Sequence, residues 1–106
     1  GILAFGNVND MNKEENGTDV VVTSALWHME SAINHAISLT KAGNFKAEEY
    51  HHWTMMAKGG ASLAPYYEFE DKVPGSVKSQ VASLASDITA GKFTVEIIDS
   101  EPKSTF

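Results

Sequence analysis

The chain has 106 residues. Because a domain averages roughly 150 residues, this length allows one domain and excludes a second. Hydrophobic residues make up 42% and charged residues 21%, the usage of an ordinary globular fold. Fourteen acidic against eight basic side chains give a formal net charge of -6, the wrong sign for a nonspecific nucleic-acid binder. The absence of cysteine excludes disulfide frameworks, thiol catalysis and thiolate zinc sites.

The first two predicted elements are strands. Residues 2–5 form a short apolar run with no positive region before it, so it is not a signal peptide. Residues 20–22 are a β-branched run typical of a buried parallel strand, and the polar loop 11–19 lies between. We expect the two strands to be adjacent and parallel. We also expect a chain that opens directly on a strand to be a piece of a longer protein.

A helix is predicted over residues 25–41. Thr23 and Ser24 are good N-cap types, and Gly43 stands where a helix C′ glycine is expected. We expect this helix to pack across the first two strands. Its apolar face comprises Leu26, Met29, Ile33, Ala36, Ile37 and Leu39.

The second half of the chain continues the alternation. An aromatic-rich run over residues 50–57 predicts a third strand, and Pro74 precedes a second helix that ends near Gly91. Residues 93–98 predict a last strand. This order indicates an α/β fold with a parallel sheet, in which ligands bind outside the carboxyl ends of the strands. The apolar face of the second helix is Val77, Val81, Leu84 and Ile88.

Metal and catalytic patterns are weak. His28 and His35 are seven residues apart, too far for one ion, and neighbouring His51 and His52 would point to opposite sides of a strand. Serines are plentiful, but none lies in a Gly-x-Ser-x-Gly elbow. We predict neither a metal site nor a catalytic site, and no cofactor.

The acidic cluster of Glu68, Glu70 and Asp71 has two interpretations. It is either a general acid/base pair or, several times more often for such runs, a solvated face. A small α/β enzyme using these carboxylates or a histidine therefore stays open as an alternative.

Trp27 is the most informative residue. It is predicted to lie in the first turn of the helix that follows a buried strand, facing the ligand crevice. An indole there stacks on a flat ligand, while Asn7, Asn9 and Asp10 at the neighbouring strand end supply polar contacts. The competing interpretation, about equal in weight, is that Trp27 packs in the core.

Several segments, taken in order, resemble the C-terminal third of the basic membrane protein family, substrate-binding lipoproteins of ABC transporters. They are residues 20–26, 41–45, 56–66 with its Gly-Gly-x-x-Leu-Ala-Pro-Tyr run, 73–74 and 88–93. The resemblance implies a portion of a two-lobed type I periplasmic-binding-protein fold, with residues 1–50 forming the cleft and 51–106 the hinge strand, helix and tail. It implies a purine base or nucleoside as ligand, a membrane permease as partner, and a periplasmic or membrane-anchored extracytoplasmic location.

The chain departs from this family at two places. Val8 stands where the family has the first aspartate of its Gly-Val-Asp-Ser-Asp segment, and Asp10 matches the second. Ala57 replaces a usual lysine, and Lys58 follows one position later. Both departures argue against recognition of a nucleoside sugar and favour a base alone or a different small molecule as ligand. The expected binding residues are Asn7, Asn9, Asp10, Trp27 and Lys58, and a ligand-sensing regulatory domain of the same fold is an alternative function.

Overall fold

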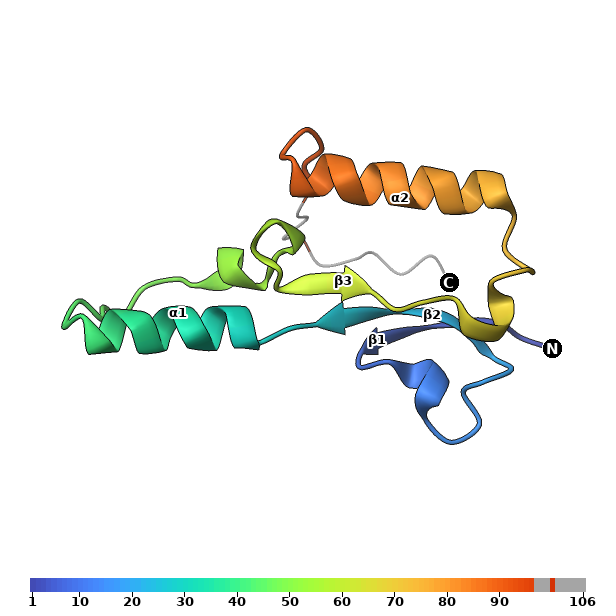
Figure 1. Cartoon of the computed structure of the whole chain (residues 1–106), viewed down its shortest axis with the longest axis horizontal. Helices are drawn as coiled ribbons and strands as arrows, with labels where there is room; N and C mark the ends of the chain where they lie inside the picture. The colour runs from blue at the N-terminus through green and yellow to red at the C-terminus, as the bar shows by residue number, and fades with distance from the viewer. Residues whose placement is uncertain (97–99, 101–106) are drawn as a thin grey trace.

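The computed structural model describes residues 1–96 and 100. Its strands are β1 (Ala4–Val8), β2 (Val21–Trp27) and β3 (Ala61–Leu63), which form one sheet in the order β1-β2-β3. The two α-helices are α1 (Glu30–Lys41) and α2 (Gly75–Thr89), as Figure 1 shows. The α/β class expected from the sequence is confirmed.

The pairing of β1 with β2 is parallel, as predicted. Close approach of the two strands depends on Gly6, because a Cβ there would lie 2.2 Å from the Ser24 Oγ. That hydroxyl accepts a hydrogen bond of 3.1 Å from the Met11 N–H and so ties the following loop to β2. Thr23 and Ser24 are therefore buried strand residues, and their predicted role as helix caps is wrong.

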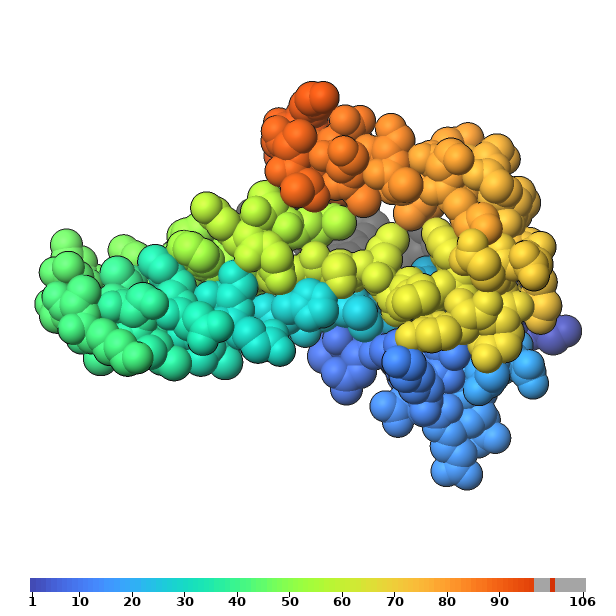
Figure 2. All heavy atoms as spheres, viewed as in Figure 1, coloured from blue at the N-terminus to red at the C-terminus, as the bar shows by residue number. Residues whose placement is uncertain are grey.

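The first helix begins at Glu30, five residues later than predicted. Residues 25–27 extend β2 instead, because their backbone pairs with β3 from Ala25 opposite Leu63 to Trp27 opposite Ala61. Figure 2 shows α1 as part of an arm that projects beyond the sheet, where it contacts the 3₁₀ helix His51–Thr54. The prediction that this helix packs across the first two strands is wrong.

The predicted third strand over residues 50–57 is also wrong. Two 3₁₀ helices, His51–Thr54 and Met56–Lys58, occupy that segment. The chain then turns at Gly59, whose φ of 72° suits glycine, and β3 runs antiparallel to β2. The sheet is therefore mixed, and the predicted all-parallel sheet is wrong, because the chain turns back at Gly59 and Gly60 and pairs β3 with β2 in the opposite direction.

The second helix matches its prediction. Pro74 is the N-cap of α2, and Gly91 follows the helix with a φ of 71°. Residues 93–96 are not in a strand, and the rest of the predicted last strand lies outside the described residues.

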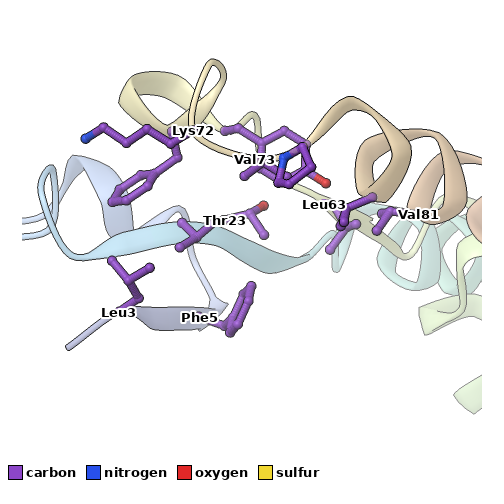
Figure 3. Close-up of a pocket in the computed structure, with 12 residues that line it drawn as sticks. Leu3, Phe5, Thr23, Leu63, Lys72, Val73 and Val81 are labelled. Carbon is purple, nitrogen blue, oxygen red and sulfur yellow. The ribbon is translucent and has the colours of Figure 1, made fainter.

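A hollow of about 480 Å³ lies between α2 and one face of the sheet. Figure 3 shows Leu3 and Phe5 on the side of β1 and Val81 on the side of α2. Its lining is Leu3, Phe5, Val22, Thr23, Leu63, Tyr66, Phe69, Lys72, Val73, Pro74, Val77 and Val81.

The apolar core is small. Its buried members are Val21, Val22, Ala64 and Phe69, and neither α-helix contains a buried residue. The radius of gyration is 17.2 Å, whereas a compact domain of about 100 residues has roughly 13 Å. Within the described part of the chain, no helix is long and apolar enough to cross a membrane.

Candidate functional site

The carboxyl ends of β1 and β2 lie side by side. Asn7 pairs with Ala25, and Val8 pairs with Leu26. Trp27 is the last residue of β2, not a residue of the first helical turn as predicted, and 57% of its surface is exposed. Core packing, one of its two interpretations, is therefore wrong, and the indole lies at the sheet end where the asparagines were expected.

A tight turn at the end of β1 positions the two asparagines. The Asn9 N–H donates to the Asn7 carbonyl over 3.0 Å, and Val8 between them has a φ of 74°. This is a γ-turn of the rare type, which is strained for a β-branched residue. The Asn7 Oδ1 also accepts from the Val8 N–H at 3.0 Å. Both asparagines are exposed, Asn7 near the end of the strand pair and Asn9 just after it.

Asp10 is engaged by Tyr67, from a 3₁₀ helix far along the chain, and by Lys13 of its own loop. Its Oδ2 accepts a hydrogen bond of 2.5 Å from the Tyr67 hydroxyl and lies 3.6 Å from the Lys13 Nζ. The Lys13 ammonium also lies 5.3 Å from the centre of the Tyr67 ring. Tyr67 first, and the charge of Asp10 after it, hold the pKa of the exposed Lys13 above its usual value. These contacts engage the Oδ2 of Asp10, whereas its Oδ1 is buried without a hydrogen-bond partner.

Asn12 anchors that loop and was missed by the sequence reasoning. It is only 4% exposed, and its Nδ2 donates to the Val21 carbonyl at 3.1 Å and to the Thr18 carbonyl at 3.4 Å. The same nitrogen is 3.3 Å from the Glu68 Oε2. Nothing in its local sequence distinguishes Asn12 from the exposed polar residues of the loop.

The acidic cluster does not form an acid/base pair. Glu68 contacts Asn12, whereas Glu70 forms an ion pair with the Lys78 Nζ at 2.5 Å. Each of these two carboxylates therefore has its own structural partner. Among the described residues, no group of three potential metal ligands is present.

Lys58 is held beside an aromatic cluster. Its Nζ lies 5.1 Å from the centre of the Trp53 ring, and its carbonyl accepts a 2.7 Å hydrogen bond from the Ser31 hydroxyl. His35 stacks on the same indole, with ring centres 4.0 Å apart. The stack and the Ser31 hydrogen bond connect α1 to the segment before β3, which contains Lys58.

A hollow of about 290 Å³ borders Trp27. It is lined by Trp27, Met29 and Thr54. One hydrogen bond joins the neighbouring turn to the residue after β2: the Gly60 carbonyl accepts from the His28 N–H over 2.9 Å. The site is thus an exposed indole at a sheet end, flanked by a small recess.

The structure also brings His28 to Ser62, which the sequence reasoning did not pair. The His28 Nε2 and the Ser62 Oγ share a hydrogen bond of 2.7 Å. Such a contact is the first element of an activated serine nucleophile. His28 directly follows β2 and Ser62 lies in β3, 34 positions later, so only the antiparallel pairing of these two strands reveals the contact.

No family model matches this sequence, and a search of curated proteins finds no match to it.

Proposed function

We propose that the chain is part of a solute-binding protein of the basic membrane protein type, with a type I periplasmic-binding-protein fold. It serves an ABC importer outside the cytoplasm and binds a small planar ligand such as a purine base or nucleoside. The proposal rests on the resemblance of segments such as residues 56–66 and on the arrangement at the carboxyl ends of β1 and β2.

The exposed Trp27 is the observation that carries the ligand proposal. A large apolar ring that stays 57% exposed at the end of a strand offers a face for stacking. The hollow between Trp27, Met29 and Thr54 gives a planar group room beside the indole. Stacking on an aromatic platform tolerates any nucleobase, since every base has a flat π face.

The predicted polar contact residues favour recognition of a base over a sugar. Asn7 and Asn9 carry amide donors and acceptors that match the edge of a heterocycle. Asp10, the carboxylate best suited to sugar hydroxyls, already accepts a hydrogen bond from Tyr67. Lys58 supplies a positive charge from the segment before β3, where it lies over Trp53.

Quenching of tryptophan fluorescence tests this proposal. The chain has two tryptophans, so a Trp53→Phe variant reports on Trp27 alone and a Trp27→Phe variant on Trp53 alone. We expect adenine or guanosine to quench the first variant saturably, though with weak affinity because the chain supplies only part of the contacts, and to leave the second almost unchanged. Equal, unsaturable quenching of both variants would contradict a stacking site at Trp27.

A hydrolase is the second candidate, and one contact favours it. The hydrogen bond between His28 and Ser62 resembles a base and its nucleophile. Hydrolysis of a p-nitrophenyl ester, abolished in a Ser62→Ala variant, would support this candidate over the binding proposal. We expect no such activity, because the function proposed above is binding and release of a ligand.

A further inference from the structure

The recess beside Trp27 is small and carries few polar groups. Its volume is about 290 Å³, and its lining is Trp27, Met29 and Thr54. Pockets for small molecules measure roughly 300 to 1,000 Å³, so this recess lies at their lower end. It suits a single planar ring system, and the polar groups of its lining decide which edge of that ring system is favoured.

The Thr54 hydroxyl already uses its hydrogen. Its Oγ1 donates to the His51 carbonyl over 2.6 Å, within the 3₁₀ helix His51–Thr54. A carbonyl oxygen only accepts hydrogen bonds, so the hydroxyl is the donor in this contact. The lone pairs of Oγ1 are still available, and they make Thr54 an acceptor in the lining of the recess.

The other described residues of the lining offer no side-chain donor to a base that stacks on the indole. The Trp27 N–H lies in the plane of its own ring and points away from a group stacked on the ring face. The Met29 thioether is a weak acceptor. A stacked base therefore meets acceptors, of which the Thr54 oxygen is the stronger.

Contacts of its neighbours hold Thr54 in place. The preceding Trp53 stacks on His35 of α1, with ring centres 4.0 Å apart. The Met55 N–H that follows donates to the His52 carbonyl over 3.4 Å. An acceptor that is already positioned loses less conformational freedom on binding, so its hydrogen bond contributes more to the affinity.

We propose that Thr54 selects a base that carries an amino group, such as adenine, over one that carries a keto oxygen in its place, such as hypoxanthine. The amino group donates to the Thr54 Oγ1, whereas the keto oxygen faces a second acceptor. To donate to hypoxanthine, the hydroxyl must leave the His51 carbonyl without its partner. This inference rests on the proposed function, because it assigns an edge to the base that stacks on Trp27.

The fluorescence of Trp27 in the Trp53→Phe variant measures this preference, with adenine, hypoxanthine and unsubstituted purine as ligands. We expect adenine to bind at least about fivefold more tightly than hypoxanthine, the effect of roughly one hydrogen bond. Adding Thr54→Val removes the hydroxyl and should weaken adenine roughly 2- to 10-fold, with purine unchanged. Adding Thr54→Ser instead keeps a hydroxyl and should retain the preference for adenine.

Thr40→Val is the matched control for the valine variant. The Thr40 Oγ1 donates to the Ala36 carbonyl within α1, and Thr40 does not line the recess. This variant loses the same kind of helix contact and should leave all three affinities unchanged. Thermal melts compare the folding of the two valine variants. The preference for adenine is itself measured with Thr54 intact, so it does not depend on how well Thr54→Val folds.

The outcomes separate this inference from the proposed function. Equal binding of adenine and hypoxanthine, or an equal effect of Thr54→Val on all three ligands, would overturn the inference and leave the stacking site at Trp27 standing. A preference for hypoxanthine would also overturn it and would point to the N–H groups at the start of α1, which no side chain caps. If none of the three ligands quenches Trp27 saturably, the proposed function and this inference both fail.

Discussion

Trp27 has few packing contacts to lose, so its removal separates ligand binding from stability. In Trp27→Ala we expect a change in unfolding free energy below about 1 kcal/mol, because most of the ring is exposed. Affinity for a stacked base should fall by roughly 1 to 3 kcal/mol in the assembled binding protein. Thermal melts and ligand titrations on the same variant measure both quantities.

Trp53 provides the control for that variant. Its ring is stacked by His35 and lies beneath the Lys58 ammonium, so Trp53→Ala should cost on the order of 2 kcal/mol of stability. A Trp27→Ala variant that melts as early as Trp53→Ala, with affinity intact, would remove Trp27 from the site.

Val8 stores backbone strain at the same sheet end. Its φ of 74° is unfavourable for a β-branched residue, at a cost of roughly 1 to 3 kcal/mol. Glycine adopts this conformation freely, so Val8→Gly should raise the free energy of unfolding by about 1 kcal/mol after the entropic penalty of glycine. Urea denaturation measures the change. Val20→Gly, at a valine without positive φ, should instead be destabilising.

At the scale of elements, the turn before β3 depends on a close approach of two backbones. A Cβ on Gly60 would lie 2.2 Å from the Trp53 carbonyl oxygen. We expect Gly60→Ala to destabilise the protein by about 1 to 3 kcal/mol, because the turn and the 3₁₀ helix His51–Thr54 must shift.

Gly75→Ala is the matched control for this turn. A Cβ on Gly75 meets open space at the first residue of α2, so alanine should be neutral or stabilise by about 0.5 kcal/mol. Chemical denaturation of both variants checks the pair. Equal stability of the two alanine variants would show that the turn relaxes without cost.

For the whole molecule, the site is open on one side. The proposed ligand contacts come only from the ends of β1 and β2 and from the segment before β3, and the second lobe of the proposed fold contributes none in this chain. The free energy of the contacts must offset the translational and rotational freedom that the ligand loses on binding. The chain alone supplies only half of the contacts of a closed cleft, so it should bind purines weakly. Calorimetry against adenine and guanosine should show no tight complex. Submicromolar affinity would contradict the two-lobed proposal.

Local patterns predicted the elements that local physics controls. The β-branched run at residues 20–22 and the long connection before it gave the parallel pair β1 and β2. Pro74 and Gly91 marked both ends of α2, because proline suits a helix start and glycine takes the positive φ after its end. Asn7 and Asn9 were expected at the end of the first strand and lie there, whereas Trp27, predicted in a first helical turn, is the last residue of β2.

The first helix shows where local patterns fail. Leu26 and Met29 fit a helical spacing, yet residues 25–27 are strand because β3 offers them a hydrogen-bonding partner. The partner strand is distant in the sequence, and with only three residues, Ala61–Leu63, it is too short to show a strand periodicity. The aromatic run at residues 50–57 likewise resembles a strand. It forms 3₁₀ helices instead, and its Trp53 ring stacks on His35 of α1.

The sequence by itself determined the α/β class, the parallel pair and the limits of α2, since these depend on neighbouring residues and on the bulk of apolar side chains. Only the tertiary structure decided the antiparallel place of β3, the projection of α1 from the sheet, the commitment of Asp10 to Tyr67 and the contact of His28 with Ser62. Each of these features depends on contacts between residues that are tens of positions apart in the sequence. Such contacts form when the chain closes on itself, and their free energy depends on partners that no local window contains.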